Sequence, residues 1–565
     1  MKKTLILILA FALVIALFAG CGGGNAGAPK ESAPAETASP YHYAKGNFKA
    51  DARGIATEKY DYQLPFCETG ETLSFWTVSW NPEYIPEEGF ATMEFPQELK
   101  KQTGVNMEYS IISRENMQAS FAVLVAADDL SDLMMHGVSY YNGTVKEAVD
   151  DGYFINIYDY RDYCPNYMYE SVYRDPSDKN TYADVFYEDD FVYSLWDLYS
   201  GPVIDMGPVI RTDWARELGY EREDIVTWDQ MYDIMVGMKV KEYTPAPWQM
   251  MSTLEINGSK FFASFDTIGY LDANNLQAPF QKDNKVQMLH ITDGDKELIT
   301  YINKCWEAGL IDPDWGSAKN NNDYQLTKAE QTGLFNTTTF GIGTLEAHNS
   351  DPNAEYRTIH KLLRTKDQVL HTGMASSRVS YGETCVSAKG RNIPLAVTWC
   401  DYRYADQAFI LMNYGVQGLT WDYNAAGEVE LTDFTLNHPQ GLSASWVPLL
   451  YALNDKADCG LEDPNRKMAY PEGKRFIEYG EIWTDFQYDG AWEWPASLHL
   501  TDEEQQRVNQ YSGDYITYIA ENYTGFVYGS NPLSQWDNYV KGALEIGGQA
   551  IADIYQTALD NFNKA

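Results

Sequence analysis

The sequence is poor in basic side chains for its size. Its 42 lysines and arginines stand against 81 aspartates and glutamates, which gives a formal net charge of −39. A nucleic-acid binder needs a positive surface, so this composition argues against nucleic acid as a partner. An acidic surface keeps a chain soluble and repels other polyanions, so uncharged ligands are mildly favoured.

Cysteine and the common catalytic motifs are also scarce. The chain has seven cysteines, no two of them in a CxxC motif, and its histidines show neither an HExxH nor a zinc-finger spacing. It has no P-loop and no nucleophile elbow. We therefore predict no metal site, no cofactor and no catalytic residues. Whether the later cysteines are buried thiols or disulfides stays open: Cys67, Cys164, Cys305, Cys385, Cys400 and Cys459.

The sequence holds one long apolar run, from Leu5 to Ala19, which follows two lysines. This layout is typical of an export signal. The run is shorter than the ~20 residues of a comfortable membrane span. It ends in Leu17-Phe18-Ala19-Gly20-Cys21, which resembles the bacterial lipobox and implies removal of residues 1–20 and lipidation of Cys21. Because two or more acyl chains anchor a protein stably, we expect it on the extracellular face of the cell membrane.

Residues 21–64 are expected to form a flexible tether. The segment is rich in Gly, Ala, Pro, Ser and Glu and has almost no apolar periodicity, so it cannot bury enough surface to fold. Residues 22–27 match the GxGxxG pattern of dinucleotide-binding folds. No strand precedes them and no helix follows, so we reject that interpretation.

Aromatic residues are abundant, with 42 tyrosines, 15 tryptophans and 23 phenylalanines. Tyrosine and tryptophan combine a flat apolar body with a polar group, which suits ligands that are partly polar and partly apolar. Sugars are ligands of this kind, because their C–H faces stack on rings while their hydroxyls take hydrogen bonds. Most single tryptophans pack in cores, but those in expected loops, such as Trp80 and Trp492, favour a binding surface.

The folded part begins with alternating strand and helix patterns. We expect strands over 73–78, 105–109 and 132–135, separated by helices over 95–103 and 117–127. This alternation predicts βαβ units and a parallel sheet. Ligands of such sheets bind beyond the carboxyl ends of the strands. The loops after the first and third strands are therefore the expected binding region.

Several short stretches resemble one known family in the same order. They are AADDLSDL (126–133), VIRTDWARELG (209–219), YINKCWEAGLIDP (301–313) and NYGVQG (413–418). They are similar to segments of the type 1 extracellular solute-binding proteins, the receptors of carbohydrate ABC importers. The resemblance runs from about residue 70 to 562 and extends to the large lipoprotein subgroup. Leu195-Trp196 replaces the family's Leu-Pro, and Asp128-Asp129 replaces Gly-Asp.

The resemblance implies an α/β, two-lobed periplasmic-binding-protein-like fold of type II. Each lobe would be a mostly parallel sheet flanked by helices, with the ligand cleft between the lobes and closure about a hinge. The first lobe would comprise 65–198 and 372–440, and the second 199–371 and 441–565. Residues 536–562 show a helix-period apolar stripe for packing on a lobe. The implied protein is a non-enzymatic monomer that hands an oligosaccharide to ABC transporter permease subunits.

Candidate ligand-binding residues follow from position and side-chain chemistry. Rings would stack on sugar faces, and acids and amides would take hydroxyls in a mostly preformed pocket. In the first lobe they are Trp76, Trp80, His136 and Tyr140. In the second lobe and hinge they are Trp196, Asp197, Trp248, Asn336 and Glu346, with Trp446 and Trp483 from the late segments.

Three alternatives stay open. Some alginate-binding relatives carry a calcium loop, and Asp178, Asn180 and Asp184 offer oxygens. The segment lacks the EF-hand glycine and terminal glutamate, so a solvated turn is favoured. A surface glycoside hydrolase would also use an aromatic cleft, with paired carboxylates. A peptide receptor on the same scaffold is the third alternative.

Overall fold

The fold is described from a computed structural model of the chain. It describes residues 39–564, apart from 114–115, 202–205, 251–258, 268–278, 315–327, 453–457 and 472. The expected signal peptide, Cys21 and the first part of the tether lie outside the described residues. The chain divides into Met1–Pro40 and a compact unit, Tyr41–Ala565, which contains every helix and strand described below.

The first lobe is built on a six-stranded sheet with the order β14-β4-β11-β3-β1-β2. Strand β1 runs parallel to β2 and β3, β14 runs parallel to β4, and β11 is antiparallel to both its neighbours. The sheet is therefore mostly parallel, as expected. Its strands are β1 (Thr72–Val78), β2 (Asn106–Ile112), β3 (Leu133–Met135), β4 (Leu195–Tyr199), β11 (Val379–Val386) and β14 (Gly460–Glu462).

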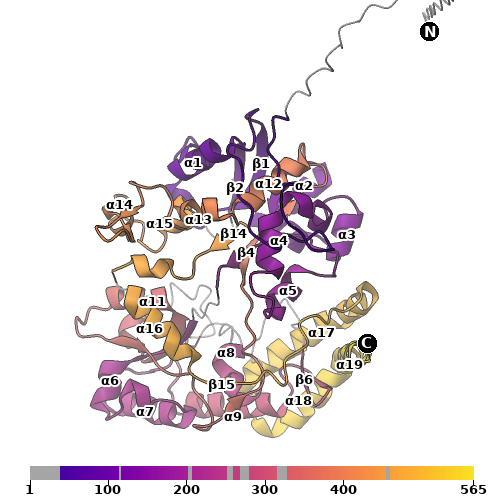
Figure 1. The fold of residues 1–565 in the computed structure, drawn as a ribbon. Coiled ribbons are helices and arrows are strands. Elements are labelled where there is room, and N and C mark those ends of the chain that lie inside the picture. The colour runs from indigo at the N-terminus through magenta and orange to yellow at the C-terminus, as the bar shows by residue number, and fades with distance from the viewer. Residues whose placement is uncertain are drawn as a thin grey trace, which may run out of the picture. The chain divides into compact units, whose positions relative to one another are not determined.

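Short helices accompany this sheet (Figure 1). They are α1 (Glu94–Thr103), α2 (Met117–Ala127), α3 (Val145–Asp150), α4 (Pro165–Val172), α5 (Lys179–Val185), α12 (Ile393–Tyr402), α13 (Asp406–Tyr414), α14 (Asp433–Leu436) and α15 (Val447–Tyr451). Helix α1 ends at Gly104, whose φ of 76° permits the left-handed cap. Helix α2 ends at Asp128, which takes the same conformation with φ 55° although it is not glycine.

The second lobe contains a three-stranded sheet with the order β8-β5-β9. Both pairings are antiparallel, so this sheet differs from the mostly parallel sheet expected for each lobe. The strands are β5 (Met206–Arg211), β8 (Leu334–Thr338) and β9 (Tyr356–Thr358). The helices are α6 (Thr212–Glu217), α7 (Trp228–Val240), α8 (Ser259–Phe262), α9 (Asp293–Glu307), α11 (Thr339–His348), α16 (Gly473–Thr484) and α17 (Asp502–Val527).

Three two-stranded ribbons complete the described strands. They are β6 (Phe280–Lys282) with β7 (Lys285–Gln287), β10 (Val369–Leu370) with β15 (Gln487–Tyr488), and β12 (Trp421–Tyr423) with β13 (Val429–Leu431). The β10–β15 pair is parallel and the other two are antiparallel.

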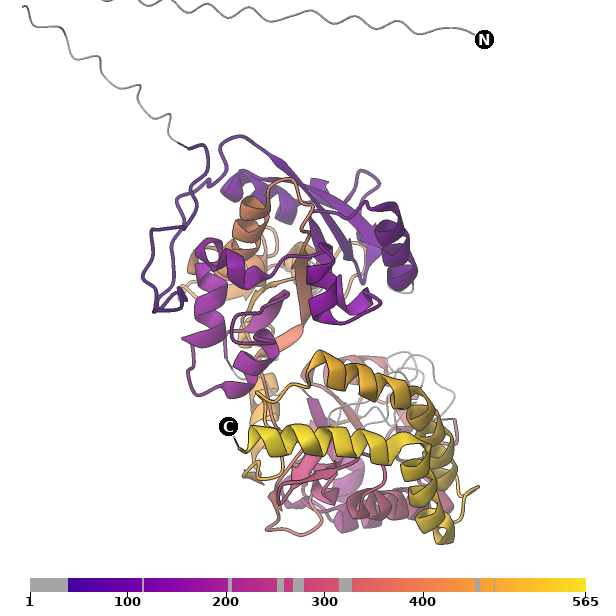
Figure 2. The ribbon, with the colours of Figure 1, turned by 90° about the vertical axis from the view of Figure 1, so that its right-hand side faces the viewer.

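The apolar stripe predicted one continuous C-terminal helix, but the structure shows a broken one. It consists of α18 (Trp536–Ala543), a π-helical turn (Leu544–Gly548) and α19 (Gln549–Phe562), which contact α17 (Figures 1 and 2). The break lies at Gly547, with φ 147°, where an added Cβ would come within 2.9 Å of the Cβ of Tyr511. Among the described helices, α17 to α19 included, none is long and apolar enough to cross a membrane.

Two segments pack against the first lobe although they were expected elsewhere. Residues 41–64 pack against the first lobe: Ile55 is fully buried, and the Tyr62 hydroxyl donates to Asp401 at 2.7 Å. Strand β14 and helix α15 also belong to the first lobe, because Val447 and Leu461 lie in its core. The polar composition of residues 41–64 masks this packing, which a few aromatic and aliphatic side chains provide.

Candidate functional site

Four strands of the first lobe meet at the sheet edge where ligand-binding residues are expected. Strands β1, β3 and β4 run in the same direction, and β11 runs against them. The carboxyl ends of the three strands and the amino-terminal half of β11 therefore meet at this edge. Trp80 follows β1, His136 follows β3 and Tyr381 lies in β11. Trp196 lies near the amino end of β4, where it pairs with Glu383. In open α/β sheets this is the edge where ligands bind.

A bulge in β11 presents Tyr381. Val379 pairs with Leu198 and Glu383 pairs with Trp196, so five residues of β11 lie opposite three of β4. Bulges of this kind re-aim a side chain and are frequent beside binding sites. Tyr381 is 45% exposed, which is high for a large ring within a central strand. Sequence reasoning missed Tyr381 and Glu383, although Gly382 inside a β-prone run is a recognisable bulge signal.

Tyr381 is the centre of an aromatic cluster, which we define as Trp80, His136, Tyr140 and Tyr381. The Tyr381 ring centroid lies 4.8 Å from that of His136 and 5.9 Å from that of Trp80. The rings of His136 and Tyr140 meet edge to face at 6.5 Å. Trp80 and Tyr140 are half-buried, so they keep part of their surface accessible. Tyr381, which was not predicted, thus joins Trp80 to the predicted pair His136 and Tyr140.

A buried carboxylate lies beneath the aromatic cluster. Glu383 is 1% exposed, and its oxygens lie 3.2 Å from Nδ1 of His136 and 2.8 Å from the Ser194 hydroxyl. The Ser139 hydroxyl, 3.3 Å away, also donates to Glu383. These partners satisfy a charge that would otherwise be costly to bury.

Two other predicted residues of this edge lie deeper. Trp76 is 2% exposed, and its indole nitrogen donates to Ser120 at 3.3 Å, so its ring supports the cluster from below. Asp197 is fully buried in β4, next to the half-buried Trp196. In this conformation neither Trp76 nor Asp197 presents surface to a ligand.

The remaining predicted residues lie in cores or in ion pairs. Trp248 and Trp483 are each 1% exposed, and Trp483 donates to the Pro208 carbonyl at 3.0 Å. Asn336 is a buried residue of β8, and Trp446 packs against the first-lobe core. Glu346 bonds Arg357 and Arg475 at 2.7 and 2.6 Å. The structure gathers none of these five around Tyr381, and their ligand-binding roles stay predictions.

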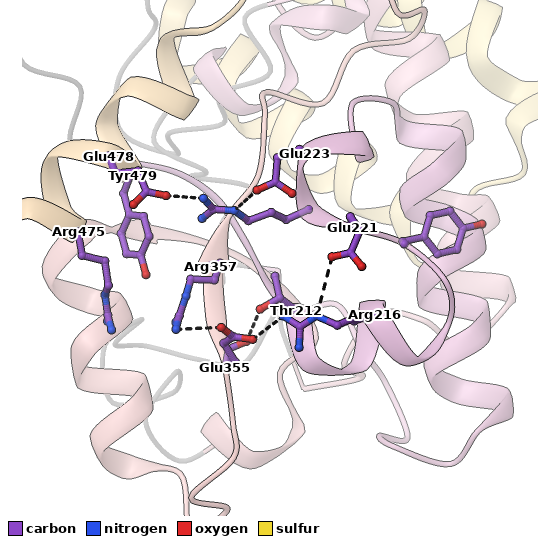
Figure 3. Close-up of a pocket in the computed structure, with 11 residues that line it drawn as sticks. Thr212, Arg216, Glu221, Glu223, Glu355, Arg357, Arg475, Glu478 and Tyr479 are labelled. Atoms are coloured by element: carbon purple, nitrogen blue, oxygen red, sulfur yellow. Dashed lines mark hydrogen bonds and ion pairs between the residues drawn. The ribbon is translucent and has the colours of Figure 1, made fainter.

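A separate cavity of about 320 Å³ lies in the second lobe (Figure 3). Its lining is dominated by arginine and glutamate side chains that neutralise one another. Arg216 bonds Glu355 at 2.8 Å, Arg357 bonds Glu355 at 3.0 Å, and Arg222 lies between Glu223 and Glu478. The ion pairs link β9, α6 and α16, so a structural role accounts for them.

The segment considered for calcium is folded as a helix cap. The Asp178 carboxylate accepts from the Thr181 backbone amide at 3.0 Å and from Arg378 Nε at 3.2 Å. A guanidinium bound to the same carboxylate opposes a cation there, so these residues do not fit calcium. Over the described part of the chain, no group of three or more His, Cys, Asp or Glu side chains is arranged to hold a metal ion.

Solved structures of other proteins match the fold over nearly the whole chain. An extracellular solute-binding protein from Bifidobacterium longum subsp. infantis is 16% identical with a TM-score of 0.65, over 91% of this chain and 99% of its own. No model of a protein family matches the sequence, and no curated protein matches it either. The similarity therefore lies in the fold more than in the sequence.

Two further structures match at similar levels. An HMO-binding, ABC-transporter-associated solute-binding protein from Bifidobacterium longum infantis is 15% identical, with a TM-score of 0.66 over 87% of this chain and 99% of its own. The ABC-transporter substrate-binding protein FusA of Streptococcus pneumoniae, solved with kestose, is 17% identical, with a TM-score of 0.63 over the same shares. The chain therefore has the fold of the extracellular solute-binding proteins, which confirms the predicted fold class.

Proposed function

We propose that this protein is a membrane-anchored extracellular solute-binding protein that captures an oligosaccharide and delivers it to the permease subunits of an ABC transporter. One observation carries the proposal. The partly exposed rings of Trp80, Tyr140 and Tyr381 gather at the ligand edge of the first-lobe sheet. The fold is that of solute-binding proteins, among them one solved with kestose. Partly exposed rings beside hydrogen-bonding groups suit the two kinds of surface of a sugar.

Capture would follow the hinge closure of two-lobed receptors. The aromatic cluster belongs to the first lobe, so a sugar would bind there first and the second lobe would close over it. The predicted second-lobe residues are buried or paired in this conformation, so their contribution requires that closure. We infer that the protein acts as a monomer.

Membrane attachment would depend on lipidation of Cys21. Residues 22–40 would then separate the lipid from the compact unit that begins at Tyr41. Expressing the full chain and Cys21→Ser in a bacterial host tests this point. The full chain should fractionate with membranes, should have lost residues 1–20 and should carry added mass on Cys21, whereas the variant should carry no added mass. An unmodified Cys21 in the membrane-associated full chain would refute the lipid anchor.

Thermal unfolding of residues 22–565 with glycans tests the binding function. A ligand that binds only the folded state stabilises it by RT ln(1 + [L]/Kd), so micromolar binding is detectable at millimolar ligand. The panel contains the neutral trisaccharides kestose and maltotriose, the acidic trigalacturonate and a peptide pool. A saturable increase in melting temperature with a glycan supports the proposal. A shift with peptides alone would instead identify a peptide receptor.

The same incubations decide between a receptor and a glycoside hydrolase. A hydrolase needs two carboxyl groups flanking the scissile bond. The carboxylates described at this edge, Glu383 and Asp197, are 1% and 0% exposed, which favours binding without turnover. Chromatography of the glycans after overnight incubation should show no cleavage products. Cleavage by the wild type that disappears in Glu383→Gln would overturn the receptor assignment.

A further inference from the structure

The protonation of His136 is constrained by its neighbour Glu383. Nδ1 of His136 lies 3.2 Å from the Glu383 carboxylate, and the His136 backbone amide donates to the Glu383 carbonyl at 3.1 Å. The Ser194 and Ser139 hydroxyls already donate to the same carboxylate. An ionised carboxylate only accepts hydrogen bonds, so Nδ1 must carry the proton. In a neutral imidazole Nε2 is then bare and accepts hydrogen bonds.

Nothing in the described structure donates to this acceptor. Nε2 of His136 is buried and has no hydrogen-bond partner. A positive φ of 49°, unusual for a non-glycine residue, holds His136 at the end of β3. Its ring contacts Tyr140 and Tyr381.

Tyr381 is the most exposed member of this group. It is 45% exposed and lies within the β11 bulge, whereas His136 is 9% and Glu383 1% exposed. Its ring lies against the His136 imidazole, so a shift of the Tyr381 ring would open one side of that imidazole without opening the hydrophobic core. A second unpaired nitrogen, the buried Nε1 of Trp196, is a donor on the residue that pairs with Glu383 in the sheet.

We propose that Glu383 is a positioning residue: it fixes His136 with Nε2 as a hydrogen-bond acceptor, and displacement of Tyr381 presents that acceptor to a hydroxyl of the bound sugar. The assignment of a sugar rests on the proposed function. The ligand is then an uncharged glycan with a free hydroxyl at this contact. A carboxylate at the same position offers no proton to Nε2 and is repelled by Glu383. An O-methylated sugar would leave the acceptor unpaired.

The tautomer is measured directly, without any glycan. Residues 22–565 labelled with ¹⁵N-histidine should show His136 in a long-range ¹H–¹⁵N spectrum as the neutral form protonated on Nδ1, assigned through His136→Gln. Glu383→Gln offers Nδ1 an amide donor as well as an acceptor, so the fraction of His136 protonated on Nε2 should rise. Ser139→Ala, which leaves the carboxylate in place, is the control and should keep the wild-type tautomer. An Nε2-protonated His136 in the wild type would overturn the proposal.

The role of Tyr381 is tested by chemical access to Nε2. Diethyl pyrocarbonate should modify His136 slowly in the wild type and markedly faster in Tyr381→Ala, as followed by peptide mass spectrometry. Tyr423→Ala removes another exposed ring, 53% exposed, outside the cluster, and should leave the rate unchanged. Equal rates in the wild type and both variants would refute the role of Tyr381 as a cover.

Binding experiments with glycans then distinguish the proposed receptor function from the proposed roles of Glu383 and His136. Kestose at millimolar concentration should stabilise the wild type more than trigalacturonate does, and Glu383→Gln should bind it about tenfold more weakly, the loss expected for one hydrogen bond. A stronger response to trigalacturonate, or undiminished kestose affinity in Glu383→Gln, would overturn the selectivity. If no glycan binds, the proposed function fails, while the tautomer and modification results still decide the roles of Glu383 and Tyr381.

Discussion

Arg403 and Asp458 form an ion pair inside the first lobe, with only 1% and 2% of their side chains exposed. The pair connects the end of α12 to the start of β14, which is remote in sequence. Removing one partner leaves an uncompensated buried charge, so Arg403→Met should lower the free energy of unfolding by about 3–5 kcal/mol in urea titrations. The double variant Arg403→Met/Asp458→Leu should recover part of that loss. A single variant as stable as the wild type would contradict the cost assigned to the unpaired charge.

The N-terminal segment gives a second prediction, about where the folded unit begins. Ile55 is fully buried, and Tyr62 donates to Asp401. A chain of residues 41–565 should therefore melt at the same temperature as 22–565, whereas 65–565 should melt several degrees lower or fail to fold. Differential scanning calorimetry of the three chains measures this. Equal melting temperatures for all three chains would mean that residues 41–64 add no stability, as expected for a tether that extends to residue 64.

Asp401 gives a prediction about pH. Burial raises the pKa of Asp401 to about 6, although it accepts from Tyr62, Asn166 and the Tyr167 amide. An unfolded aspartate titrates near ~3.9, so between these values the folded state binds more protons than the unfolded state. The contribution of Asp401 to stability is therefore largest at low pH and falls as pH rises from about 4 to 6, by up to about 1.4 kcal/mol per unit.

Urea unfolding of the wild type and Asp401→Asn at several pH values measures this contribution. The variant is expected to be less stable throughout, because it loses an acceptor of buried amides. The stability difference between the two proteins should shrink as the pH rises from 4.5 to 7. A difference that does not depend on pH would show that Asp401 titrates in its ordinary range.

A fourth prediction concerns packing in the second lobe. A Cβ added at Gly207 would lie 2.5 Å from the Trp483 ring, so Gly207→Ala should destabilise by about 1–3 kcal/mol. Gly343 lies within α11 with nothing within 4 Å of an added Cβ. Gly343→Ala is thus the matched control and should stabilise by about 0.5–1 kcal/mol through helix propensity. Equal effects in thermal unfolding would contradict the close contact with Trp483.

The elements of the first lobe could be predicted from the sequence because their signals are local. The apolar run of β1 and the glycine that ends α1 act within a few residues. The break at Gly547 and the burial of Tyr62 depend on contacts with Tyr511 and Asp401, which no local pattern contains. The site divides in the same way. His136 was predicted from its place after a strand, whereas Tyr381 depends on a bulge that only the pairing of β11 with β4 creates.

Exposure separates the tryptophans and tyrosines that could bind a ligand from those that hold the fold. Tyr381 is 45% exposed and Trp248 1%, although both are large rings with β-type backbone pairing. Tyr381→Ala should weaken glycan binding by tenfold or more, the size of about 1.4 kcal/mol, while the melting temperature of the free protein stays nearly constant. Trp248→Ala should do the reverse and lower stability by about 3–5 kcal/mol, because it opens a cavity in the second-lobe core. Isothermal titration with kestose and urea unfolding of both variants measure the two quantities separately. If Trp248→Ala instead lost affinity at unchanged stability, the Trp248 ring would have to contact the ligand in a closed form. That result would support the binding role predicted for Trp248 from the sequence.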